Sequence, residues 1–140
     1  MGGGSWSVFD HTADLGVEIV APTLEEIYRT AACALFAQIV DPATVMPRLQ
    51  REVRVTGTDH EELLVRWLAE LLSVHDAEGL LFRDFAIEEL SEGRLTGRAR
   101  GEACDPQRHD LRGEIKAVTY HQISVRREGS SWRARVILDV

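Results

Sequence analysis

The order of two kinds of hydrophobic periodicity constrains the fold of this chain more than any single motif does. Apolar residues recur at three- and four-residue intervals over residues 24–39 and about 59–78, which predicts two amphipathic helices. Four strand-like segments then follow at 80–90, 94–104, 114–127 and 132–140. Because both helices precede this run of strands, a doubly wound sheet is disfavoured. We predict an α+β fold with two layers, in which an antiparallel or mixed sheet carries the two main helices on one face.

The ends of both helices have recognisable sequence signals. Thr23 followed by Glu26 has the spacing of a capping box, and Asp59 followed by Glu62 repeats the pattern before the second helix. Gly79 can adopt the left-handed conformation that ends a helix, so we expect the second helix to finish there.

Two shorter strands are expected earlier in the chain. Residues 10–14 (DHTAD) indicate a polar loop that enters a strand in which Val17 and Ile19 alternate with other residues. Val53 and Val55 flank a charged residue and predict a second short strand before a turn at Gly57.

Length and composition favour one domain over residues 1–140. A chain of 140 residues with 44% hydrophobic residues can bury a single core. The glycine-rich residues 1–5 are expected to be a flexible extension. No apolar run approaches the roughly 20 residues that span a bilayer, and the first residues lack the features of a signal peptide. We therefore expect a soluble, cytoplasmic protein.

The charge of the chain argues against a nonspecific grip on nucleic acid. The formal net charge is -7, whereas a phosphate backbone requires a basic face. Residues 1–90 hold 16 acids and 6 bases, and residues 91–140 hold 7 acids and 10 bases. This distribution favours a protein partner. A local arginine patch from the second part could still contact RNA, or its arginines could simply be solvated.

Lys116 is singular in the composition. It is the only lysine among 16 basic residues, the other 15 being arginine. A background that favours arginine so strongly should have replaced a lysine that serves only as a surface charge. Either chance left Lys116 in place, or the chain needs a compact, flexible amine there.

Oxygen ligands gather at the C-terminus. Alternation along residues 132–140 places Trp132, Ala134, Val136 and Leu138 toward the core, so Asp139 points away from it. The Asp139 carboxylate, together with the main-chain and terminal oxygens of Val140, would suit a hard cation, although a terminal aspartate can equally be solvated.

A second group of candidate ligands lies near the other end of the chain. Asp10, His11 and Asp14 could coordinate a metal, but Asp14 could instead cap a turn and His11 could be an ordinary polar residue. Sequence spacing alone does not bring the two groups together.

Motifs of self-sufficient enzymes are missing from the sequence. Residues 1–5 lack the lysine spacing of a phosphate-binding loop, no Gly-x-Ser-x-Gly elbow occurs, and neither Cys33 nor Cys104 lies in a nucleophile or metal-ligand motif.

Several segments, taken in order, resemble the archease family. They are residues 10–18 (DHTADLGVE), 23–26 (TLEE), 78–82 (EGLLF), 100–102 (RGE) with 105–106 (DP) and His109, 115–121 (IKAVTYH) and 136–140 (VILDV). No single segment is decisive, but the ordered combination is specific and covers nearly the whole chain.

This resemblance implies a fold, a metal site and a partner. In the family the two chain ends approach and bind a divalent cation, with calcium most expected. Carried over by motif, Asp14, Asp139 and Val140 would be ligands, Lys116 would act on the partner, and His11 and His121 would support the site or lie on the surface.

The implied function is that of an accessory protein rather than an enzyme. An archease promotes guanylylation and multiple turnover of an RtcB-type RNA ligase in tRNA splicing. That ligase uses GTP and manganese, so any tRNA contact would be transient and made through the ligase complex, and no membrane would be involved. The alternatives are a chaperone or general protein-binding module and, less favoured, a free-standing metal-dependent hydrolase.

Overall fold

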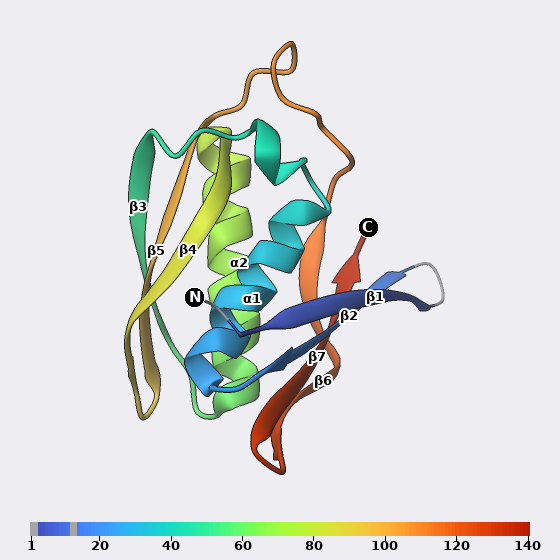
Figure 1. The fold of residues 1–140 in the computed structure, drawn as a ribbon, viewed down its shortest axis with the longest axis vertical. Helices are drawn as coiled ribbons and strands as arrows, with labels where there is room; N and C mark the ends of the chain where they lie inside the picture. The colour runs from blue at the N-terminus through green and yellow to red at the C-terminus, as the bar shows by residue number, and fades with distance from the viewer. Residues whose placement is uncertain (1–2, 12–13) are drawn as a thin grey trace.

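The computed structural model describes residues 3–11 and 14–140, which form two α-helices, one short 3-10 helix and seven β-strands (Figure 1). In chain order the elements are β1 (Ser5–His11), β2 (Asp14–Ala21), α1 (Leu24–Ala37), η1 (Pro42–Thr44), β3 (Leu49–Thr56), α2 (His60–Glu78), β4 (Leu80–Ser91), β5 (Arg94–Ala103), β6 (Ala117–Glu128) and β7 (Ser131–Asp139).

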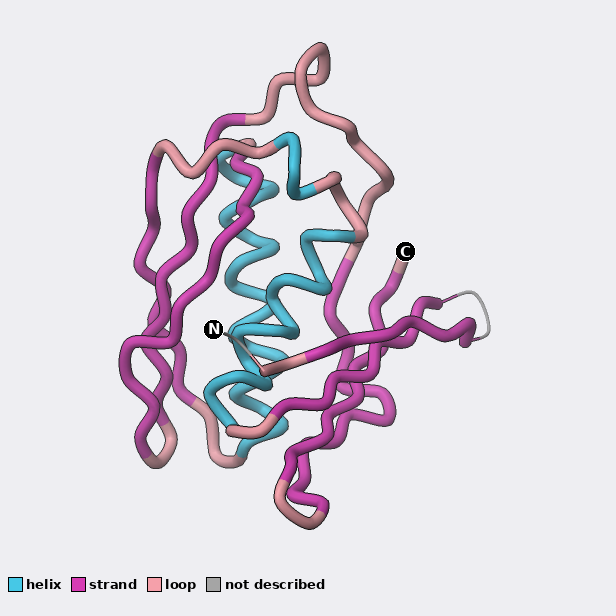
Figure 2. The backbone as a smooth tube through the Cα atoms, in the orientation of Figure 1, coloured by secondary structure: helices cyan, strands magenta, loops and turns pink. Residues whose placement is uncertain are grey.

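The strands form two separate antiparallel sheets with the helices between them. The four-stranded sheet has the order β1-β2-β7-β6 and the three-stranded sheet the order β3-β5-β4. Helix α1 contacts β2 and β4, and α2 contacts β3 and β6, so each helix touches both sheets. The two sheets accordingly lie on opposite sides of the helical layer (Figure 2).

The predicted α+β class and antiparallel pairing are confirmed, whereas the predicted two-layer arrangement, with both helices on one face of one sheet, is wrong. The physical reason lies in α1, which is buried around most of its circumference. Ile27 and Leu35 are joined in the core by Ala32 and Phe36, which lie on other faces of the helix. A helix that is apolar on several sides needs cover on several sides, which a second sheet provides.

The helix ends are those that the sequence predicts. Thr23 Oγ1 accepts a hydrogen bond from the Glu26 N–H (3.2 Å), and an Asp59 carboxylate oxygen accepts one from the Glu62 N–H (2.8 Å). Gly79 has a φ of 66° and follows the last residue of α2. Each such N-cap stabilises its helix by about 1 kcal/mol.

The start of the chain differs from the predicted polar loop. Residues 5–11 form β1, which pairs with β2 as a hairpin from Ser5 opposite Val20 to His11 opposite Asp14. Trp6 and Val8 alternate with serines at the start of β1, but Phe9 interrupts this short pattern, so the sequence did not set β1 apart from the polar segment that follows. Of the glycine-rich start, Gly3 donates to Glu26 Oε1 (3.0 Å), and residues 1–2 and 12–13 lie outside the described part.

The core fills the space between the layers. The largest fully buried side chains come from both helices and from strands of both sheets: Trp67, Tyr28, Phe36, Phe82, Ile19, Ile27, Leu35, Leu64, Leu68, Leu71, Leu81 and Leu95. The indole N–H of Trp67 donates to the Tyr28 carbonyl (2.9 Å), which joins the two helices inside this core. No helix of the described residues is long and apolar enough to cross a membrane.

Candidate functional site

The last residue of β1 and the first residue of β2 share one row of the four-stranded sheet with the C-terminal end of β7. His11 lies opposite Asp14, Asp14 opposite Asp139, and Asp139 opposite Ala117. We call these four residues the terminal row. Directly opposite residues in an antiparallel sheet have Cα atoms about 4.5–5.5 Å apart and side chains on the same face. The two carboxylates, which are far apart in sequence, are therefore neighbours.

The alternation of β7 explains the orientation of Asp139. Ala134, Val136 and Leu138 are buried, as the sequence predicts, and Asp139 lies on the opposite face and is partly exposed. Ile137 shares the outer face with Asp139 yet has an exposed fraction of 0%. Something on the outer face of the sheet therefore covers Ile137.

An aromatic ring covers this part of the outer face. Phe9, Gly16 and Ile137 lie opposite one another across three strands. They form the nearest row to the terminal row on the same face of the sheet. The Phe9 ring occupies the space above Gly16, where a Cβ atom would lie only 2.2 Å from the ring carbon Cζ. The guanidinium of Arg135 lies over the same ring, 5.0 Å from its centroid. We call Phe9, Gly16, Ile137 and Arg135 the outer layer.

Glu18 fixes the arginine of the outer layer. Its carboxylate accepts hydrogen bonds from Arg135 (2.7 Å) and Arg133 (2.9 Å). The hydrogen bond from Arg135, followed by the other contacts with the two arginines, lowers the pKa of Glu18 against an opposing effect of burial. The outer face of β7 is thus braced from β2.

Lys116 joins the site through its backbone. Its N–H donates to the Asp139 carbonyl (2.7 Å), so the segment that enters β6 is tied to the C-terminal end of β7. Its exposed side chain lines a groove of about 470 Å³ between the start of β6 and α2 residues that include Ser73 and Asp76. Within the described parts of the chain, the Lys116 amine has no ion pair.

The remaining predicted site residues lie at varied distances from the terminal row. Val140 follows Asp139 and is 45% exposed. His121 lies further along β6, in an irregular stretch between Thr119 and Ser124, where its N–H donates to Thr119 Oγ1 (3.3 Å). The backbone of His11 belongs to the row, but its side chain lies outside the described part.

The candidate ligands described at the terminal row and next to it offer oxygen atoms. The carboxylates of Asp14 and Asp139 lie on one face of the sheet, and Val140 with its main-chain oxygen follows Asp139. Calcium and other hard cations prefer such ligands, so these residues fit a hard divalent ion. Among the described side chains, no group of three or more His, Cys, Asp and Glu is placed to hold a metal.

A second polar cluster lies at the C-terminal end of β5, where Glu102 is surrounded by hydrogen-bond donors. Glu102 has an exposed fraction of 5% and accepts hydrogen bonds from Arg108 and from the Met46 N–H (2.7 Å). His109 Nδ1 accepts from the Asp105 N–H (2.9 Å), so its Nε2 carries the proton and donates to Glu102 (2.9 Å). These donors, Arg108 foremost, lower the pKa of Glu102 from 4.5 to about 2.

This buried cluster anchors the long connection between β5 and β6. The same connection is held further along by backbone hydrogen bonds from Asp41 to Asp110 (2.9 Å) and from Arg112 to Ile39 (2.8 Å). The connection ends at Lys116. The sequence indicated Glu102 and His109 only as parts of family motifs, and the cluster gives both residues a structural role in holding this connection.

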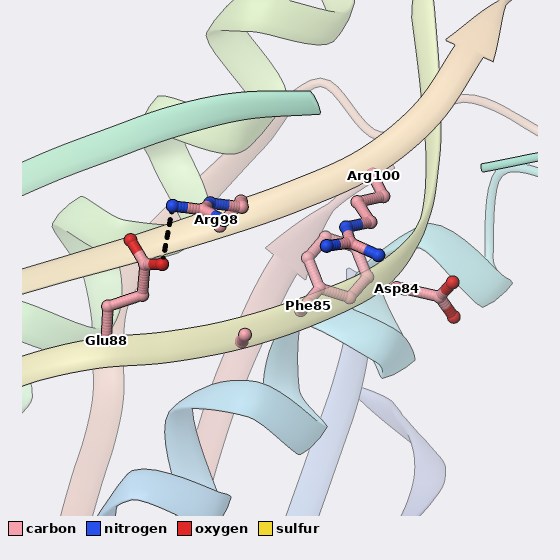
Figure 3. Close-up of a pocket in the computed structure, with 6 residues that line it drawn as sticks. Asp84, Phe85, Glu88, Arg98 and Arg100 are labelled. Carbon is pink, nitrogen blue, oxygen red and sulfur yellow. Dashed lines mark ion pairs between the residues drawn. The ribbon is translucent and has the colours of Figure 1, made fainter. Parts of the chain in front are cut away.

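A hollow of about 400 Å³ on the three-stranded sheet is a weaker candidate. Figure 3 shows Arg98 paired with Glu88 (2.7 Å), and Arg100 beside Phe85 and Asp84. The hollow therefore holds two arginines and two acids, and its charges balance. Nothing in its chemistry selects one ligand class.

The arginines of the second half of the chain do not form a continuous unpaired surface. Within residues 3–11 and 14–140, six of the ten basic residues after position 90 have an ion-pair partner, namely Arg98, Arg108, Arg112, Arg126, Arg133 and Arg135. Of the others, Arg94 and Arg100 lie on β5, Arg127 lies on β6, and Lys116 directly precedes β6. This distribution favours a protein partner over direct binding of RNA.

The fold and site together define a class: a small α+β domain with two helices between two antiparallel sheets, and a polar site built where β1 and β2 meet the C-terminal end of β7. The model of the archease protein family (MTH1598/TM1083) matches residues 6–140. The chain belongs to the archease family.

Individual relatives agree with this membership. The chain is 41% identical to the archease of Pyrococcus abyssi over 96% of this chain and 98% of that protein. It is 42% identical to the archease of Methanopyrus kandleri, over 96% and 99% of the two chains.

Solved structures show the same fold. The solution structure of protein 1598 of Methanobacterium thermoautotrophicum is similar with a TM-score of 0.83 and 40% identity, over 96% of this chain and 98% of that one. An archease of Thermotoga maritima, described as a possible chaperone, shares the fold with a TM-score of 0.68 and 20% identity, over 94% of each chain.

Proposed function

We propose that this protein is a cytoplasmic accessory factor that activates an RtcB-type RNA ligase in tRNA splicing, and that it uses a calcium site at the terminal row to do so. The observation that carries the proposal is the pairing of Asp14 with Asp139 beside the C-terminal residue. Two like charges placed directly opposite each other destabilise a sheet. Such an arrangement is useful where an external cation balances it.

Asp14, Asp139 and Val140 would hold the ion. A bound calcium ion supplies positive charge that offsets these carboxylates and favours one arrangement of the start of β2 and the chain end. The residues themselves then present a fixed oxygen-rich surface to the ligase. His11 and His121 are supporting positions at or near this surface.

Lys116 is the residue that we assign to contact with the ligase. Its backbone bond to Asp139 places it next to the terminal row, and its side chain is exposed on the groove side. A compact ammonium there can pair with a phosphate or an acidic side chain at the ligase active site. The ligase itself uses GTP and manganese, and this protein promotes its guanylylation. Contact with tRNA is made only through the ligase complex.

A chaperone or general protein-binding module is the alternative. The Thermotoga maritima relative is described as a possible chaperone, and Trp6, Val8 and Tyr120 are exposed apolar residues of this chain. That function would need broad apolar contact and would be indifferent to Lys116.

The deciding experiment is multiple-turnover RNA ligation by the cognate ligase with GTP and Mn²⁺, together with a direct assay of ligase guanylylation. Wild-type protein should stimulate both. Asp139→Ala and Lys116→Ala should reduce stimulation by about tenfold or more, equivalent to at least about 1.4 kcal/mol of lost interaction. Lys116→Arg should also stimulate less, because a guanidinium does not reproduce a compact amine.

The matched control is Asp84→Ala, which removes an exposed carboxylate on the outer face of the other sheet. It should stimulate like wild type. Full stimulation by Asp139→Ala would rule out the proposed role of the terminal row. Lack of stimulation by wild-type protein at every ratio would instead favour the binding-module alternative.

A further inference from the structure

We infer that Phe9 is a positioning residue: its ring closes the outer layer over Gly16 and Ile137 and thereby keeps Asp139 opposite Asp14. The inference rests on the proposed cation site, because it concerns how the ligands are held. It assigns a role to an aromatic residue that carries no ligand atom.

Ile137 is buried although it lies on the outer face of its sheet. It faces away from the core, yet its exposed fraction is 0%. On the β6 side Ile137 lies opposite Thr119, whereas on the β2 side its neighbour Gly16 has no side chain that could cover it, and the next residue in the row is Phe9. The Phe9 ring fills the space above Gly16, with three of its atoms within 2.5 Å of where a Cβ would be. The ring therefore reaches across β2 toward β7.

The Phe9 ring is also contacted by Arg135 of β7. Arg135 projects from β7, and its guanidinium lies 5.0 Å from the centroid of the Phe9 ring. Glu18 on the intervening strand holds that guanidinium by a hydrogen bond of 2.7 Å. A side chain from β7 thus lies over a ring from β1, and the three strands are braced on their outer face.

These contacts cover Ile137, which lies two residues before Asp139, the last residue of β7. Strand β7 ends at Asp139, and terminal residues separate from their neighbours unless they are tied down. On one side, Asp139 is tied by the hydrogen bond from Lys116. Ile137 is the last residue before Asp139 on the outer face of β7. The apolar contact that buries Ile137 is therefore the last one on this face before the candidate metal ligand Asp139.

Only glycine fits at position 16, because the Phe9 ring occupies the space that a larger side chain would need. The φ of Gly16 is not in the left-handed region, so an alanine backbone would be tolerated, but an alanine methyl would occupy the position of the Phe9 ring. Gly16→Ala should push the ring outward and uncover Ile137. Phe9→Ala should uncover Ile137 directly. The two substitutions act on one contact, so their effects should not add.

The experiment is calcium titration calorimetry on wild type, Gly16→Ala, Phe9→Ala and the double variant, with Gly113→Ala as control. A Cβ at Gly113 would meet only ordinary contact, with Gln38 O at 3.5 Å. Each single variant should bind calcium about fivefold more weakly, on the scale of one lost aromatic–guanidinium contact. The double variant should bind no more weakly than Phe9→Ala, and Gly113→Ala should bind like wild type. Wild-type calcium affinity in Phe9→Ala would overturn the inference.

Amide hydrogen exchange in EDTA separates this inference from the proposed cation site. Phe9→Ala should speed exchange about fivefold at residues 138–139 while leaving the helices protected as in wild type. This result is expected even if wild-type protein binds no calcium, which would defeat the cation site alone. Unchanged exchange at residues 138–139, or equal acceleration throughout the domain, would show that Phe9 does not position the chain end.

Discussion

The buried Glu102 cluster and the terminal row both bring acidic groups together with segments distant in sequence, but they differ in burial and in the residue that lies next to each acid. Glu102 is surrounded by donors from its own chain: Arg108, His109 and the Met46 N–H. The terminal row places Asp14 opposite Asp139 and contains neither lysine nor arginine. A buried acid that is held by several donors contributes to stability, whereas two acids placed opposite each other on one face of a sheet can share an external cation. Substitutions at the two places should therefore have effects of opposite sign.

The largest effect on stability is expected from Glu102→Ala. The substitution leaves the Met46 N–H and the buried His109 without their acceptor, and removes the partner of Arg108. Breaking a buried network of this kind costs about 3 kcal/mol. Urea unfolding should show this loss. The control Glu88→Ala breaks the more exposed pair with Arg98 and should cost less than about 1 kcal/mol. Equal losses in the two variants would mean that Glu102 is not a special anchor.

The pH dependence of unfolding sharpens the same comparison. The donors around Glu102, led by Arg108, hold its pKa at about 2 in the folded protein, below the ordinary value of 4.5. A lowered folded-state pKa contributes stability above the unfolded value, and that contribution is lost as the pH falls from about 4.5 through about 2. Wild-type protein should therefore lose stability over this range in urea titrations at a series of pH values.

Arg108→Ala tests the cause of that acid-dependent loss. Without the guanidinium, the pKa of Glu102 should return toward its ordinary value, and the part of the loss that comes from Glu102 should shrink. An unchanged pH profile in Arg108→Ala would assign the loss to other carboxylates.

The sequence predicted the features that depend on local periodicity. The helices, with their caps at Thr23 and Asp59 and the end at Gly79, follow from spacing and short-range hydrogen bonds. The outward orientation of Asp139 likewise followed from the alternation of β7. Such signals lie within a few residues and need no knowledge of the rest of the chain.

Features that depend on strand pairing were less accessible. The alternation of β2 does not say that β1 lies beside it, nor that β7 lies on its other edge with Asp139 opposite Asp14. The sequence predicted one sheet where the structure has two. The apolar residues around α1 can be assigned to two sheets only when the strands on both sides of the helix are known. Phe9 and Gly16 gave no signal for the same reason: their relation exists only across strands.

Asp139→Asn is expected to have the smallest effect on stability, and of the opposite sign to Glu102→Ala. In EDTA it removes one of two opposed charges while keeping the shape of the side chain, so the free energy of unfolding should stay equal or rise by about 0.5 kcal/mol. Calcium should stabilise wild type in thermal unfolding and should no longer stabilise the variant, since binding to the folded state alone raises the melting temperature. A fall of 1 kcal/mol or more in EDTA would mean that Asp139, like Glu102, is balanced from within the chain. The contrast between the two acidic places would then disappear.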